Sequence, residues 1–293
     1  MTNTTAQTSA DSTGTSASTP LAEIIAAAGD LACGGRWHRA VSLLDATTVT
    51  GGQARALLAL AAAEVTLAEE WFGETSAAAG RLSTAQEACA TADLEPGSRW
   101  DLAFLRLRHD YFDQLLGPEG FRAGPDGKDP DALADIRARA GELRGLAPDE
   151  VRRGWAEMYL GLIADNLVGE RDAAPAHYQA ALRAGESGDD LLAREALRHL
   201  GDHDHDRGDN QLALERWRRA TALGARAGAV PGTLSQQMLL AVLARDAGDE
   251  AGAAALAAEI ARWAAALGAE RLAAQANGFL AGADPTAPPP DRP

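Results

Sequence analysis

The sequence predicts an all-α protein, and three observations support this. Alanine accounts for 67 of the 293 residues, whereas only seven are valine and five are isoleucine. Aromatic residues make up 5% of the chain, so the side chains that β-sheets favour are scarce. Apolar residues recur at helical spacing in segments of about 15 to 18 residues, separated by short Gly, Asp or Pro breaks. Together these features predict a fold built from helical hairpins.

Both ends of the chain have the composition of disordered tails. Residues 1–19 are rich in Ser and Thr, and residues 282–293 are rich in Pro. Neither segment has enough apolar side chains to bury. We therefore expect one helical domain over residues 20–281. Its longest interruption, residues 117–130, contains four glycines and three prolines and is predicted to be an exposed loop.

Charge and composition argue against several classes of partner. The formal net charge is -15, which should repel nucleic-acid phosphates and anionic lipid headgroups. No apolar run approaches the roughly 18 residues of a membrane span. The first basic residue is Arg36, so the charged start of a secretory signal is missing. Because Cys33 and Cys89 alone cannot form a disulfide framework or a zinc cluster, we expect a cytoplasmic protein.

A pattern repeats along the domain about every 40 residues. The clearest copy begins at Leu200-Gly201 and continues through the turn glycine Gly208 to an alanine, Trp217 and a second alanine. Copies are anchored on the turn glycines Gly35, Gly73, Gly127, Gly169, Gly208 and Gly248. The intervals are 38, 54, 42, 39 and 40 residues, and the longest contains residues 117–130. This spacing predicts six helix-turn-helix units followed by a final helix over residues 270–280.

Each conserved type of position in the repeat has a physical role. A turn glycine can adopt a positive φ, which lets the chain reverse between two helices. The alanine that follows lets the second helix approach the first closely. One turn later, Trp217 fills the space between the helices, and Tyr178 holds the same place in the preceding copy. The Leu-Gly pair of the first helix supplies the surface that receives the ring.

This Leu-Gly, Gly, Ala, aromatic, Ala series resembles the tetratricopeptide repeat, in its longer variant of about 40 residues. The resemblance covers residues 21–268 and is strongest over 155–268; Ala225 stands where such a repeat often closes with proline. It implies a right-handed α-solenoid in which the first helices line a concave groove and the final helix caps the last apolar face. Such solenoids usually bind peptides or protein segments. We therefore expect a scaffold or regulatory adaptor without cofactor or catalysis; a small-molecule or peptide sensor is the alternative.

The family geometry indicates which side chains face the groove. In the fifth unit these are Glu195, Arg198, Asp202, His205 and Asp206. The neighbouring units add Trp155, Met158, Leu162, Met238, Val242 and Arg245. Trp155 suits either core packing or an apolar anchor for a peptide. An acidic centre between apolar walls predicts a partner segment in which hydrophobic residues flank a basic one.

Residues 198–209 carry an unusual density of His and Asp. On a helix, His199, Asp202, His203 and Asp206 fall at i, i+3, i+4 and i+7 and share one face. Two imidazoles and two carboxylates on one face are a candidate divalent-metal site. The alternative is a solvated helix end, which needs no metal.

Asp204 lies on the inward side of the same helix, four residues before a turn glycine. Asp165 holds the corresponding place in the preceding unit. An unpartnered carboxylate buried there would cost several kcal/mol, so we expect an ion pair with Arg207 or contact with a ligand. Arg216, on the second helix, is expected on the solvated outer face.

Three His-Asp pairs bring an enzyme class into consideration. They are His109-Asp110, His203-Asp204 and His205-Asp206. All-α metal-dependent phosphohydrolases use such a pair with a further His and Asp as metal ligands. The sequence has no Gly-rich phosphate loop, nucleophile elbow or Cys/His dyad. We expect no catalysis.

Overall fold

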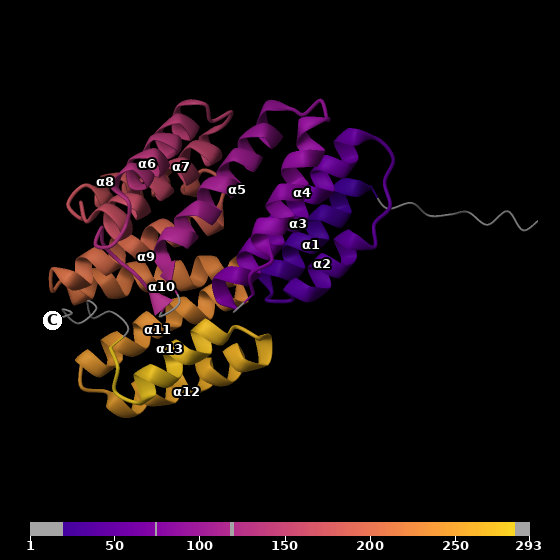
Figure 1. Ribbon diagram of the computed structural model, residues 1–293. Helices are drawn as coiled ribbons and strands as arrows, with labels where there is room; N and C mark the ends of the chain where they lie inside the picture. Colours follow the sequence, from indigo (N-terminus) through magenta and orange to yellow (C-terminus); the bar gives the residue numbers. More distant parts are fainter. Residues whose placement is uncertain (1–19, 74, 118–119, 285–293) are drawn as a thin grey trace, which may run out of the picture.

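The computed structural model describes residues 20–73, 75–117 and 120–284, and these form thirteen α-helices (Figure 1). The helices are α1 (Leu21–Cys33), α2 (Trp37–Asp45), α3 (Gly52–Phe72), α4 (Ala78–Ala90), α5 (Pro96–Leu115), α6 (Pro130–Gly145), α7 (Glu150–Ile163), α8 (Ala174–Glu186), α9 (Asp190–Asp206), α10 (Asn210–Arg226), α11 (Val230–Asp246), α12 (Glu250–Leu267) and α13 (Glu270–Leu280). Helix α7 continues into a π-helical turn, η1 (Ala164–Val168). The predicted tails 1–19 and, from residue 285 onward, 282–293 lie outside the described residues.

Neighbouring helices pack against each other in sequence order, as an array of helical hairpins requires. The predicted all-helical fold is confirmed. At the turns, Gly169 and Gly208 have φ angles of 77° and 79°, the left-handed conformation expected of them. Gly73 differs, because its φ is -102° and its N–H bonds to the Glu69 carbonyl at 2.7 Å. The expected positive φ is therefore wrong at Gly73.

Glycines within first helices receive the aromatic rings of second helices. A β-carbon on Gly201 would lie 2.4 Å from Nε1 of Trp217, and one on Gly161 would lie 2.5 Å from Cε1 of Tyr178. Both rings are fully buried. The Trp217 indole also donates a hydrogen bond to the Arg198 carbonyl at 3.0 Å. The close approach predicted for these positions is thus present, and it fixes the distance between paired helices.

The Gly/Pro-rich break contains a short hairpin that the sequence did not predict. Strands β1 (Leu116–Gly117) and β2 (Gly120–Phe121) pair in antiparallel fashion. Beyond them, the Gly124 N–H donates to the Asn166 carbonyl of η1 at 2.8 Å. The loop is therefore attached to the following unit, although Phe121 remains 58% exposed.

The first and last helices of the array meet each other. Figure 1 shows α11 to α13, in orange and yellow, beside the indigo helices α1 to α3. One apolar cluster combines Trp37 and Val65 of the N-terminal helices with Val242 and Phe279 of the C-terminal ones. Arg271 of α13 donates to the Glu70 carbonyl of α3 at 3.4 Å. This closure buries Met238 and Val242 of α11, which the sequence placed in a groove.

Candidate functional site

One face of α9 carries four half-buried polar side chains, which we call the α9 strip. They are Glu195, Arg198, Asp202 and His205. Their spacing of three or four residues places them on one side of the helix. Asp206, the last residue of α9, is exposed. Among the other predicted groove residues, Trp155 and Arg245 are also half-buried.

Glu195 is held as a carboxylate by its basic neighbours. Burial alone would raise its pKa, but Arg194 and Arg198 outweigh burial and keep the pKa below the ordinary value. Arg194 forms an ion pair with it directly. Arg108, reaching in from α5, also lowers the pKa of Glu195 and contacts Glu64 of α3 at 3.3 Å. Charged side chains of α3, α5 and α9 therefore lie near one another around Glu195.

Asp202 and His199 form a second charged group in which burial dominates. Burial raises the pKa of Asp202 to about 6 and lowers the pKa of His199 to about 3. His199 Nδ1 lies 3.5 Å from Asp202 Oδ2. Because burial favours the neutral form of both groups, this contact is not a full ion pair. The other oxygen of Asp202, Oδ1, is buried without a hydrogen-bond partner in the described part of the chain.

The apolar walls expected for the groove are buried in the core. Met158 and Met238 are fully buried, and Leu162 and Val242 are buried as well. Met238 and Val242 belong to the apolar cluster shared with the N-terminal helices. The expectation that these side chains line an open groove is therefore corrected. Closure of the array covers the face of α11 that would otherwise form a wall.

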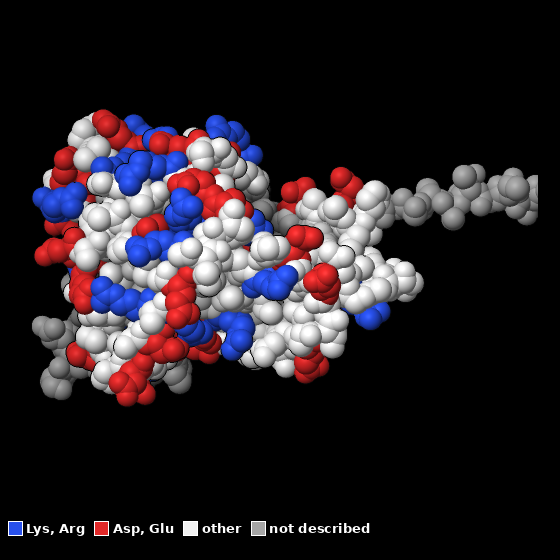
Figure 2. Space-filling model, turned by 90° about the horizontal axis from the view of Figure 1, so that it is seen from above, with Lys and Arg blue, Asp and Glu red and all other residues white. Residues whose placement is uncertain are grey.

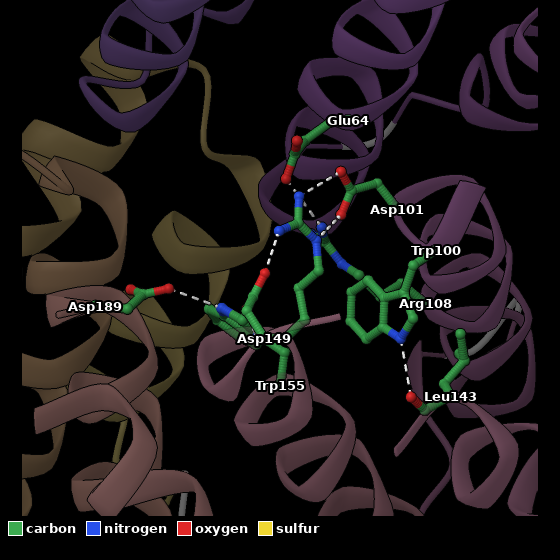
Figure 3. A network of polar contacts seen from close by, with 9 residues as sticks. Glu64, Trp100, Asp101, Arg108, Leu143, Asp149, Trp155 and Asp189 are labelled. Atoms are coloured by element: carbon green, nitrogen blue, oxygen red, sulfur yellow. Dashed lines mark hydrogen bonds and ion pairs between the residues drawn. The ribbon is translucent and has the colours of Figure 1, made fainter. Parts of the chain in front are cut away.

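Two further groove candidates, Trp155 and Arg245, form contacts with neighbouring helices. The Trp155 indole donates to Oδ2 of Asp189 at 2.8 Å (Figure 3). Oδ1 of Asp189 accepts the N–H groups of Leu191 and Leu192. Trp155 thus braces the residue that caps α9. Figure 3 also shows the nearby contact of Arg108 with Glu64.

Arg245 is committed to helix α13. Its guanidinium lies 3.4 Å from the centre of the Phe279 ring and donates to the Phe279 carbonyl at 2.8 Å. This cation–π contact and hydrogen bond attach the last helix to α11. Arg245 is consequently placed to stabilise the attachment of α13.

The four residues of the alternative metal site do not gather around one point. His203 Nε2 lies 3.0 Å from Asp165 Oδ2, and Asp206 pairs with Arg171. Over the described residues, the one group of three or more His, Cys, Asp or Glu side chains close enough to hold a cation does not include His199 or Asp202. All four residues lie on α9, but the preceding hairpin supplies Asp165 and Arg171 as partners of His203 and Asp206.

That one group lies on α5. Ligand atoms of His109, Asp110 and Asp113 come within 4.8 Å of one another. Asp110 also pairs with Arg139 of α6 at 2.7 Å, so a guanidinium already compensates part of the acidic charge. The sequence singled out His109-Asp110 and missed Asp113, although its i+4 spacing from His109 was visible.

Asp204 forms the buried ion pair that the sequence predicted. It is fully buried, and Arg207 Nη2 lies 2.5 Å from its Oδ1. Arg216, which was expected on the outer face, reaches in from α10 to within 2.6 Å of Oδ2. Asp204 is therefore part of the packing between α9 and α10, and its role is structural.

Charge on the surface is mixed. Figure 2 shows acidic and basic side chains interspersed over the face in view, so the net charge of -15 is not gathered there into one acidic area.

No model of a known protein family matches the chain, and no curated protein matches it. Across the described helices, none combines the length and apolar character needed to cross a membrane.

Proposed function

We propose that this protein is a tetratricopeptide-like binding module that recognises a segment of another protein or a peptide and performs no catalysis. Its six repeats would be the pairs α1–α2, α3–α4, α5–α6, α7–α8, α9–α10 and α11–α12, arranged as a right-handed solenoid and capped by α13. The packing of neighbours in sequence order supports this assignment. So do the matching contacts of Gly161 with Tyr178 and Gly201 with Trp217.

The observation that carries the proposal is the α9 strip. Folding alone gains little from an unpartnered buried oxygen on Asp202 or from a buried Nε of Arg198 that has no hydrogen-bond partner within the described residues. Ligand-binding surfaces do place such groups where a partner can complete their contacts. Because Met158 and Met238 are buried, the partner segment is polar, with a basic group that contacts Asp202 and Asp206.

The proposal also concerns location and partner class. It describes a cytoplasmic scaffold or adaptor, consistent with two free cysteines, Cys33 and Cys89. It excludes nucleic acid as a partner, since the net charge of -15 opposes binding to phosphates.

Affinity capture from the native cell extract tests the proposal. The intact protein should enrich a defined protein or peptide, and Asp202→Ala with Asp206→Ala should reduce that enrichment at least tenfold and weaken its salt dependence. The matched control, Glu87→Ala with Glu215→Ala, removes two exposed acids from second helices and should leave capture unchanged. Equal capture by both double variants would place the interaction away from α9.

A sensor of small molecules is the second candidate, and a different observation favours it. Gln236 of α11 is fully buried, yet neither its amide nitrogen nor its amide oxygen has a hydrogen-bond partner among the described residues. Mass spectrometry of the natively purified protein should then detect a co-purified small ligand that denaturation releases.

A further inference from the structure

A histidine and two aspartates lie close together on one turn near the end of α5. His109 Nδ1 lies 3.4 Å from Asp113 Oδ2 and 3.6 Å from Asp110 Oδ1, and each residue has a ligand atom within 4.8 Å of those of the other two. Asp113 follows His109 by four residues and Asp110 by three, so the helix places it beside both. In the part of the chain that the structure describes, no other group of three or more His, Cys, Asp or Glu side chains is arranged in this way.

These separations are longer than good hydrogen bonds but suit the ligands of one metal ion. The heavy atoms of an N–H···O hydrogen bond are about 2.7 to 3.2 Å apart. Two ligands that each lie about 2.0 to 2.1 Å from one ion, at a tetrahedral angle, are about 3.3 to 3.4 Å from each other. Both distances from His109 are close to this value. The imidazole and the two carboxylates therefore need little movement to bind the same cation.

The charge around these side chains also favours a divalent cation. Arg139 of α6 is shared between Asp110, at 2.7 Å, and Asp135, at 2.9 Å. Asp113 pairs with His109 and, among the described residues, with no lysine or arginine. Three carboxylates and one guanidinium leave two negative charges, which one divalent cation balances. Because Arg139 contacts Oδ2 of Asp110, it orients that carboxylate while Oδ1 lies nearer to His109, as outer-shell partners of metal ligands do.

Space for further ligands of the ion lies beside the carboxylates. A cavity of about 190 Å³ is lined by Asp110, Asp113 and Gln114 of α5 and by Asp135, Ile136 and Arg139 of α6. One water molecule needs much less space than this. Three protein ligands and one water molecule are the ordinary coordination of an open zinc site.

We propose that His109, Asp110 and Asp113 bind one zinc ion, with water completing its coordination. Zinc accepts an imidazole nitrogen together with carboxylate oxygens, whereas magnesium and calcium prefer oxygen ligands alone. All three ligands come from one helical turn, so the bound ion stabilises the end of α5. The site shares no residue with the α9 strip, and the two proposals are therefore tested separately.

Isothermal titration of the full chain with zinc chloride tests this inference. The tightest zinc site of the native protein should hold one ion, and His109→Gln and Asp113→Asn should each weaken that binding at least tenfold. Magnesium chloride should bind at least tenfold more weakly than zinc chloride. The matched controls, His38→Gln and Asp93→Asn, remove an exposed imidazole and an exposed carboxylate outside the group and should bind zinc as the native protein does.

Circular dichroism of each variant controls for folding. Because Asp113 is exposed and His109 is half-buried, both variants should unfold at nearly the native temperature when a chelator is present. Saturating zinc should raise the unfolding temperature of the native protein and of the two controls, since an ion that binds the folded state stabilises it. It should raise that of His109→Gln and Asp113→Asn much less.

The other outcomes overturn the proposal. Unchanged zinc affinity in folded His109→Gln and Asp113→Asn would place the ion elsewhere on the chain. Equal affinity for magnesium would show that the carboxylates attract cations without the imidazole. If the two controls weaken zinc binding as much as the two site variants do, the chain binds an adventitious ion only. The absence of zinc binding to the native protein would refute the site outright.

Discussion

Asp202 and His199 show how burial on one helix face couples charge to stability. The folded pKa of Asp202 is raised to about 6, so the folded state holds its proton more tightly than the unfolded chain does. Stability from this group is therefore present at low pH and is lost as the pH rises from about 4 to about 6. The folded pKa of His199 is lowered to about 3, so protonation is resisted and stability is lost as the pH falls from about 6.5. The two groups oppose each other between these values.

Single substitutions should separate the two effects. Relative to the native protein, Asp202→Asn should gain about 1 to 3 kcal/mol of unfolding free energy when the pH rises from 4 to 7.5, because it never ionises. Relative to the native protein, His199→Gln should gain stability when the pH falls from 7.5 to 4. Urea unfolding of all three proteins at both pH values measures these differences. Parallel pH profiles for both variants would contradict the assigned direction of the shifts.

At the scale of the element, the contact of a helix glycine with an aromatic ring sets the spacing of each hairpin. Trp217 lies against Gly201 so closely that a single methyl group has no room. Alanine is normally the better helix former by about 0.5 to 1 kcal/mol, so its exclusion here is a matter of packing and not of helix propensity. Packing and helix propensity therefore change the stability of a Gly201→Ala variant in opposite directions, and its unfolding free energy shows which is larger.

Gly201→Ala should lower the free energy of unfolding by about 1 to 3 kcal/mol, because the added methyl group forces the Trp217 ring and α10 outward. Gly141→Ala is the matched control on α6, where nothing lies within 4 Å of an added β-carbon. It should raise stability by about 0.5 to 1 kcal/mol. Thermal and urea unfolding report both values. Stabilisation by both alanines would mean that the ring yields freely and does not set the helix spacing.

At the scale of the whole molecule, closure joins segments that are more than 200 residues apart. The main chain at Gly73, the residue after α3, lies close to the start of α13. A β-carbon added to Gly73 would lie 3.4 Å from Oε2 of Glu270 and 3.6 Å from the Gly268 carbonyl oxygen. Leu272 and Phe279 of α13 are buried in the cluster that also contains Trp37. In repeat proteins, stability usually depends on contacts between adjacent units. The contacts of α13 with α2 and α3 add stabilisation between units that are far apart in the sequence.

Truncation after Gly268 removes α13 and should lower hydrogen-exchange protection in α2 and α3 as well as in α11 and α12. The reason is that the shared cluster loses Leu272 and Phe279. Truncation after Asp284 is the control, since it retains α13 and should leave protection in all four helices unchanged. A loss of protection confined to α11 and α12 would show that closure contributes little to stability.

Local spacing in the sequence determined which residues share a helix face and where each helix turns back. It predicted the all-helical fold, the pairing of Gly201 with Trp217, the polar face of α9 and the ion pair of Asp204 with Arg207. These features depend on contacts within one hairpin, which the helical period and the turn glycines specify directly. The hairpin in the Gly/Pro-rich break was missed, because its two-residue strands carry no periodic signal.

Only the tertiary structure decided which of those faces stay accessible. Helices α11 and α13 share an apolar cluster with the N-terminal helices, and local spacing in the sequence does not specify contacts between segments so far apart. Closure buries Met238, and packing among the middle helices buries Met158, although the sequence placed both on groove walls; Arg245 is attached to Phe279. Gln236 of α11 is fully buried as well, without a hydrogen-bond partner for its amide among the described residues. Burial of Met238 depends on the whole molecule, because the N-terminal helices supply part of the apolar cluster that surrounds it.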